Sequence, residues 1–206
     1  AFHEQALVDL MLDVKAYAQA SQDATLVKHI ADLLLSSGEK TKARELYKLY
    51  VDKLAEEKMT DLELKTIAAG FYQEENLELA QTVYDIYIAR ISKSFSPDKF
   101  ISELFEIAKM FVYKPLGLYD MAYAEKIYET IEELGQKNAF NQEQIYLRAF
   151  NLEKMKEYKK AREQYSQLIQ LYADTQHLDE ATYKIAMIDA YALADIKEAR
   201  SYFEKL

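Results

Sequence analysis

Apolar residues recur along almost the whole chain at the spacing of an α-helix. Between residues 2 and 17, for example, Phe2, Ala6, Leu10, Val14 and Tyr17 fall on one helical face. No run alternates with a period of two between turn signals, so the pattern predicts no β-strand. It predicts eleven helices, near residues 2–19, 24–36, 40–56, 61–74, 77–93, 98–113, 119–134, 142–154, 158–172, 179–193 and 196–205.

Turn residues mark where these helices begin and end. Gly38 is placed to take the left-handed conformation that closes a helix. Ser96 followed by Pro97 can open another, because serine caps helices and proline suits the first helical position. Further caps or stops are expected at Asp120, Gly135 and Asn141.

One short phrase occurs five times along the chain. Each copy starts with alanine and places a large aromatic residue four positions later, and the copies start 37, 44, 37 and 38 residues apart. A period in this range marks a repeat array, in which each unit buries its apolar face on the next. The aromatic residues are therefore expected in the core: Tyr47, Tyr84, Tyr128, Tyr165 and Phe203.

A second small residue lies in the helix that precedes each phrase. Small residues at paired positions allow two helix backbones to approach closely, while bulky neighbours fill the space around them. The third unit has four extra residues, Lys114 to Gly117, which favour a longer loop between its two helices. The predicted alanine pairs are Ala31 with Ala43, Ala68 with Ala80, Ala108 with Ala124, Ala149 with Ala161 and Ala186 with Ala199.

This pattern resembles the tetratricopeptide repeat, a helix–turn–helix unit with small residues at its eighth and twentieth positions. The resemblance covers residues 24–206, although the units are longer than the usual length of about 34 residues and lack the family's proline. It implies an all-α, right-handed superhelix of about five hairpins plus a leading helix. Residues 1–23 would form that helix, either as the second helix of an earlier repeat or as an irregular cap, followed by units near 24–60, 61–97, 98–138, 139–176 and 177–206.

The resemblance also implies a binding surface, because first helices of successive tetratricopeptide units line a concave groove that holds peptides. Its aromatic middle with flanking lysines would suit an extended or helical segment that has apolar and acidic residues. The positions that face this groove are Lys28, Lys65, Tyr72, Phe105, Lys109, Tyr113, Tyr146, Phe150, Lys184 and Tyr191. Some relatives bind a terminal carboxylate with Lys and Asn; Asp32 stands where that Asn is expected and would repel the ligand.

Composition argues against several other classes of protein. The formal net charge is −9 and no dense basic cluster is present, so nucleic acid is a poor partner. No stretch approaches the roughly 18 apolar residues of a membrane-spanning helix. The chain has no cysteine, and His3, His29 and His177 match no metal-ligand spacing. We therefore expect neither an enzyme nor a cofactor or metal.

A narrower resemblance concerns residues 171–191, which are similar to the linker and first helix of bacterial cell-envelope tetratricopeptide proteins. It implies a periplasmic or cell-envelope location, with the cytoplasm as the alternative. Neither end of the array has an obvious polar cap, which favours a piece of a longer array.

The favoured function is a scaffold or adaptor that binds a peptide or a partner protein in its groove. One alternative is self-assembly, in which exposed end units stack into homo-oligomers. Another is a fragment of a regulatory receptor whose superhelix tightens around a signalling peptide.

Overall fold

The computed structural model describes residues 16–17, 23–56, 59–134 and 140–206. Within those ranges the chain forms ten α-helices and no strand, which confirms the all-α class. The chain divides into two compact units, Ala1–Ser94 and Phe95–Leu206, and each is described by itself below. The predicted leading helix lies outside the described residues, apart from residues 16–17, which are helical.

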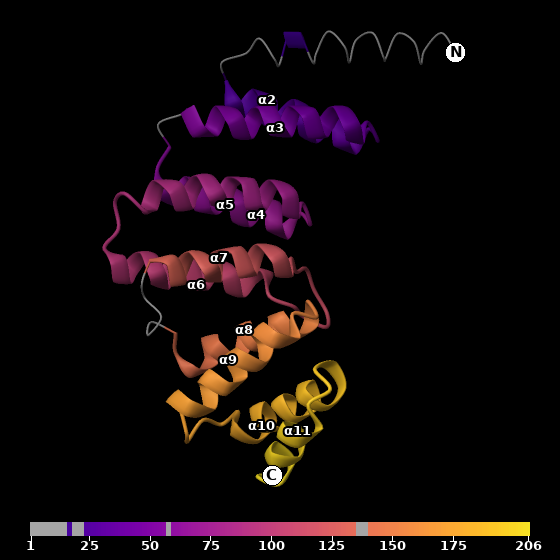
Figure 1. The fold of residues 1–206 in the computed structure, drawn as a ribbon. Helices are drawn as coiled ribbons and strands as arrows, with labels where there is room; N and C mark the ends of the chain where they lie inside the picture. Colours follow the sequence, from indigo (N-terminus) through magenta and orange to yellow (C-terminus); the bar gives the residue numbers. More distant parts are fainter. Residues whose placement is uncertain (1–15, 18–22, 57–58, 135–139) are drawn as a thin grey trace. The chain divides into compact units, whose positions relative to one another are not determined.

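Unit 1 consists of two helical hairpins. The first pairs α2 (Ala24–Ser36) with α3 (Lys40–Glu56), and the second pairs α4 (Asp61–Gln73) with α5 (Leu77–Ile91). Figure 1 shows each pair as two helices lying side by side. The second helices of the two hairpins, α3 and α5, also contact each other.

Unit 2 consists of three hairpins. These are α6 (Pro97–Phe111) with α7 (Met121–Glu133), α8 (Gln142–Lys154) with α9 (Tyr158–Leu171), and α10 (Leu178–Met187) with α11 (Ile196–Phe203). Every boundary lies within two residues of its prediction except at α10. There a single helix over 179–193 was expected, but the last turn, Ile188–Ala192, is a π-helix (η2).

Three hairpin turns share one backbone device, a residue in the left-handed conformation. Gly38 has φ 87°, as predicted, and Glu75 and Lys156 occupy the same place with φ 62° and 65°. In each turn the next amide donates a 2.9 Å hydrogen bond to the carbonyl oxygen five residues earlier. This closure reverses the chain at low cost, although a residue other than glycine carries some strain there.

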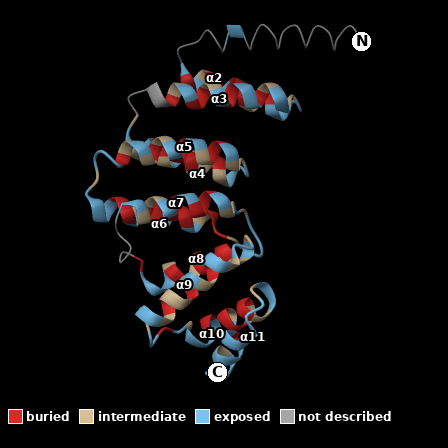
Figure 2. Ribbon diagram, in the orientation of Figure 1, coloured by how far each residue is buried: buried red, intermediate tan, exposed pale blue. Residues whose placement is uncertain are grey.

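The predicted alanine pairs lie on the buried faces of the two helices of each hairpin. All ten of these alanines are at most 3% exposed. Figure 2 shows the buried residues in red within the paired helices. The repeated aromatic residues Tyr47, Tyr84, Tyr128 and Tyr165 are also buried, which confirms four of the five predicted core positions.

Phe203 is the exception, because its side chain is 42% exposed. The prediction that it lies in the core is therefore wrong. In unit 2, α7 and α9 are each covered by the first helix of the next hairpin, α8 and α10. Among the described residues no following helix covers α11.

The loop between α6 and α7 is longer than the other hairpin turns, as Lys114 to Gly117 predicted. The fully buried Asn151 of α8 fixes this loop at both ends. Its Oδ1 accepts a 3.2 Å hydrogen bond from the amide of Tyr113, and its Nδ2 donates a 3.1 Å hydrogen bond to the carbonyl oxygen of Met121.

A buried ionic cluster joins the first two hairpins of unit 2. The guanidinium of Arg148 on α8 lies 2.7 Å from Glu125 and 2.6 Å from Glu132, both on α7. Arg148 and Glu125 are almost fully buried. Burial raises the pKa of the Glu125 carboxyl, and the contact with Arg148 opposes that rise.

The buried alanines predict that replacing alanine by leucine destabilises α5 at one position and not at another. Ala80→Leu should lower the free energy of unfolding by about 1–3 kcal/mol, because the added atoms have no room in a packed core. Ala89→Leu, at an exposed position of the same helix, should change it by less than about 0.5 kcal/mol. Urea unfolding of both variants checks this, and equal effects would contradict a close helix contact at Ala80.

The ionic cluster predicts that removing Arg148 lowers the free energy of unfolding by an amount that depends on pH. Arg148→Met leaves the Glu125 carboxylate buried without its partner, so the free energy of unfolding should fall by about 3–5 kcal/mol at pH 8. Because the folded pKa of Glu125 is raised, its contribution to stability is largest at low pH and declines as the pH rises through that pKa. Loss of Arg148 raises this pKa further, so the penalty should shrink at pH 5.

Urea unfolding at both pH values measures this effect. The double variant Arg148→Met/Glu125→Leu is the control, since an apolar pair should recover most of the stability and lose the pH dependence. A penalty of the same size at pH 5 and pH 8 in the single variant would show that lost packing, not the buried charge, is responsible.

Candidate functional site

The ten sequence-predicted surface residues divide between the two units. Three lie in unit 1, and seven lie in unit 2. In unit 1, the Nζ of Lys28 is 3.1 Å from Asp32, which also accepts a 2.5 Å hydrogen bond from the hydroxyl of Tyr47. The charge of Lys28 is thus paired within its own hairpin. The side chains of Lys65 and Tyr72 on α4 are half-buried.

Phe105 cannot serve as a surface anchor in this structure, because its side chain is only 6% exposed. Its ring packs edge-to-face against Phe140 at 5.0 Å and lies 6.3 Å from the ring of Tyr128. Phe140 precedes α8 and is itself buried, so Phe105 contributes to the packing of α6, α7 and α8. Its expected place in the groove is therefore corrected to the core.

Three of the predicted aromatic residues, Tyr113, Tyr146 and Phe150, do come together. With two neighbouring rings they form a group that we call the aromatic row: Tyr113, Tyr119, Tyr146, Phe150 and His177. The ring of Tyr113 lies 5.0 Å from Tyr119 and 5.9 Å from Phe150. Phe150 is 6.4 Å from Tyr146, which stacks on the His177 imidazole at 3.9 Å with an angle of 8° between the rings. Tyr119 and His177 were not predicted.

Two lysines approach the ring of Phe150. The Nζ of Lys154 is 4.9 Å from its centroid and that of Lys184 is 5.6 Å away, both within the range of a cation–π contact. Lys154 also lies 5.2 Å from the ring of Tyr113. Lys184 was predicted, whereas Lys154 was missed, although its place one helical turn after Phe150 was a usable signal.

Glu153 orders the polar part of this surface. It accepts a 2.8 Å hydrogen bond from Lys184 and a 3.0 Å hydrogen bond from the hydroxyl of Tyr165. Burial, together with neighbouring carboxylates, raises the pKa values of Tyr146 and Tyr165, so both hydroxyls stay protonated at neutral pH. The surface thus presents neutral aromatic rings beside lysines.

An open cavity of about 430 Å³, which we call the α10 cavity, adjoins this surface. Tyr191 stands at its edge with 81% of its side chain exposed. The lining residues are Glu153, Tyr158, Tyr183, Lys184, Met187, Ile188, Tyr191 and Ala192. Of these, Lys184 and Tyr191 were predicted as surface residues. Tyr191 lies in the π-helical turn together with Ile188 and Ala192, and the sequence shows no signal for that turn.

A buried ion pair holds that π-helical turn in place. Asp189 is 1% exposed, and its Oδ1 accepts a 2.5 Å hydrogen bond from Nε of Arg162 on α9. The carbonyl oxygen of Asp189 accepts a 2.8 Å hydrogen bond from the amide of Asp195, before α11. Turns of π-helix often occur at functional sites, and this one positions Tyr191.

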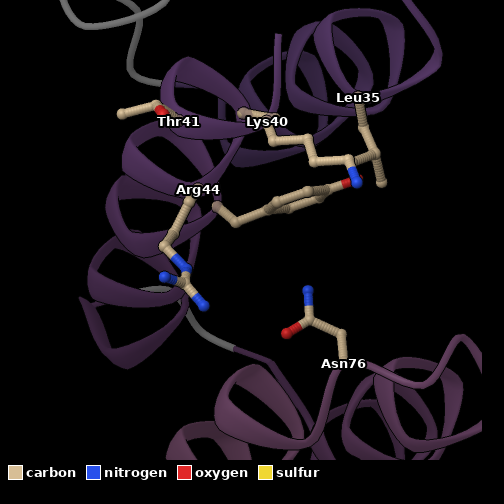
Figure 3. Close-up of a pocket in the computed structure, with 7 residues that line it drawn as sticks. Leu35, Lys40, Thr41, Arg44 and Asn76 are labelled. Atoms are coloured by element: carbon tan, nitrogen blue, oxygen red, sulfur yellow. The ribbon is translucent and has the colours of Figure 1, made fainter. Parts of the chain in front are cut away.

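A second cavity, of about 350 Å³, lies in unit 1 (Figure 3). Arg44 at its rim makes an exposed 3.0 Å ion pair with Glu78, and Asn76 caps α5 without using its side chain. Glu78 thus pairs one of the two cations, Lys40 and Arg44, that line the cavity. It is lined by Leu35, Lys40, Thr41, Ala43, Arg44, Tyr47 and Asn76.

No group of three or more His, Cys, Asp or Glu side chains in the described ranges is arranged to hold a metal ion. No helix among the described residues is long and apolar enough to span a membrane.

No family model matches the chain, and no curated protein matches it. Among solved structures, it is similar to a "putative kinesin light chain nearly identical TPR-like repeats" protein from Podosopora anserina, with 15% identity over 86% of this chain and 90% of that one, at a TM-score of 0.49. A point variant of that protein is 14% identical over 87% of this chain and 90% of the variant, at a TM-score of 0.47.

A third similar structure is MamA (41-end) from Desulfovibrio magneticus RS-1, with 15% identity over 88% of this chain and 92% of that one, at a TM-score of 0.42. The assignment of fold rests on the structure itself, namely on antiparallel hairpins with a buried alanine pair at each centre. The described part of the chain is built of tetratricopeptide-like helical hairpins.

Proposed function

We propose that this chain is a scaffold for protein–protein interaction and that unit 2 binds a segment of a partner protein. The binding surface consists of the aromatic row and the adjoining α10 cavity. One observation carries the proposal: Tyr191 is 81% exposed at an open cavity that it lines together with two other tyrosines and Met187. An aromatic side chain held in this way is suited to pack against a partner.

Aromatic side chains are effective anchors because they bury a large area and lose little conformational freedom. Interface hot spots are enriched in such residues, and a surrounding ring of weaker contacts excludes water. Phe150 and Tyr146 are half-buried, so their orientation is already fixed by neighbours before a partner arrives. This preorganisation reduces the entropy cost of binding.

The charges around the surface indicate the chemistry of the partner. Lys184 is neutralised by Glu153, but Lys109 and Lys154 are exposed and form no ion pair with another described residue. A segment with an apolar or aromatic anchor and a nearby acidic residue fits this arrangement, since its carboxylate can approach Lys154 while its anchor enters the cavity. Lys28, Lys65 and Tyr72 remain in the proposal as a separate patch on unit 1.

A peptide selection tests the proposed surface. A phage library of random twelve-residue peptides would be selected against the full chain, and the enriched peptides measured by calorimetry. We expect Tyr191→Ala and Phe150→Ala each to weaken their binding about tenfold or more, the loss of about 1.4 kcal/mol or more that marks an anchor.

The control is Leu171→Ala, at an exposed apolar position of α9 outside the aromatic row and the cavity. It should leave the affinity unchanged, and circular dichroism should show all three variants helical. Enriched peptides that bind the Tyr191 and Phe150 variants as tightly as the parent chain would refute this surface.

A further inference from the structure

The last hairpin departs from the others in the burial of its second helix. In the first two hairpins of unit 2, the repeated positions on the second helix are Tyr128 with Ile131 and Tyr165 with Leu168, all buried. The equivalent positions in the last hairpin are Phe203, the last residue of α11, and Leu206, which follows the helix; they are 42% and 57% exposed. The repeat therefore provides a packing face here that no described element covers.

This uncovered surface, which we call the α11 face, is hollowed as well as apolar. A cavity of about 420 Å³ lies on it, lined by Ala190, Ile196, Ala199, Arg200, Phe203 and Glu204. Ile196 is largely exposed, and the ring of Phe203 is supported at 6.3 Å by that of Tyr183.

Two opposite charges identify what can cover this face. Arg200 and Glu204 lie one helical turn apart and line the same cavity as Phe203. Both are exposed, and neither forms an ion pair with another described residue. In a two-fold interface, a contact from residue i to residue j is matched by one from j to i.

When two copies of α11 pair antiparallel, Arg200 of each copy therefore meets Glu204 of the other. The symmetry axis then passes between these two positions, so the two Phe203 rings meet close to it. A face with charges of one sign would repel its own copy, whereas this face is complementary to itself.

From this complementarity we infer that the α11 face pairs two copies of the chain in an antiparallel, two-fold dimer. Each copy contributes Phe203 at the centre, flanked by reciprocal Arg200–Glu204 ion pairs. The residues that make the dimer contact, Phe203, Arg200 and Glu204, belong neither to the aromatic row nor to the α10 cavity, although Tyr183, which supports the Phe203 ring, also lines that cavity. The short helix limits the contact to a small interface, for which we expect a weak dimer with a dissociation constant of about 10–100 µM.

The dimer is tested by sedimentation velocity of the full chain over rising concentration. We expect the mass to rise from one copy to two and no further. Phe203→Glu should weaken dimerisation at least tenfold, because it places a carboxylate at the symmetry axis opposite its own copy. Ser201→Glu, an exposed change on α11 outside the cavity and on the side away from Phe203, is the matched control and should leave the dimer intact.

Charge reversal distinguishes this two-fold pairing from any other association. Arg200→Glu gives a face with two acidic groups, and Glu204→Arg gives a face with two basic groups, so each variant alone should be monomeric. An equimolar mixture of the two should form heterodimers, since both contacts are then between opposite charges. The double variant Arg200→Glu/Glu204→Arg should dimerise with itself like the parent chain.

Three results would overturn the inference. The parent chain could remain a monomer at millimolar concentration, in which case a different partner covers the α11 face. Its mass could grow beyond two copies, which would indicate open head-to-tail stacking. The mixture of the two single variants could remain monomeric while the parent dimerises, which would exclude the reciprocal contact between Arg200 and Glu204.

Discussion

The close approach of two helices at a pair of alanines is the constraint on which every hairpin depends. A side chain larger than a methyl group at this point would separate the backbones and leave voids around them. Because all ten alanines are buried, the bulky residues beside them fall at fixed places. Tyr128 and Tyr165 occupy such places and are buried, whereas the equivalent Phe203 is exposed, because no described helix packs on that side of α11.

The contacts between successive hairpins differ from the contacts within a hairpin. In unit 2, two of the contacts between hairpins contain a buried charge. Glu125 with Arg148 joins α7 to α8, and Arg162 with Asp189 joins α9 to the π-helical turn after α10. Apolar packing would give as much stability, because desolvation offsets much of the attraction in a buried ion pair. Such pairs are directional, however, and each of these two restricts the rotation of one hairpin relative to the hairpin before it. The orientation of the aromatic row and of Tyr191 depends on those rotations.

This difference explains what could be predicted from the sequence. Helix boundaries and alanine pairs depend on local spacing, which is visible in the chain, so they were confirmed to within two residues outside α10. The surface depends on tertiary packing. Phe105 was assigned to the groove by its position in the repeat, but Phe140, from the segment before α8, covers it. The π-helical turn has no local signal, because it follows from the buried contact between Arg162 and Asp189, two residues 27 positions apart.

The two proposed surfaces arise from opposite consequences of the same repeat. The rings of the aromatic row contact one another in succession, so each is supported by a neighbour, and all but Tyr119 are half-buried. The α11 face lies where the succession of described helices stops, so its rings have a neighbour on one side only. A surface of the first kind is preorganised and suits a flexible ligand, whereas one of the second kind requires a partner that is already folded. A second copy of the same hairpin meets that requirement, because its helix is formed before the contact is made.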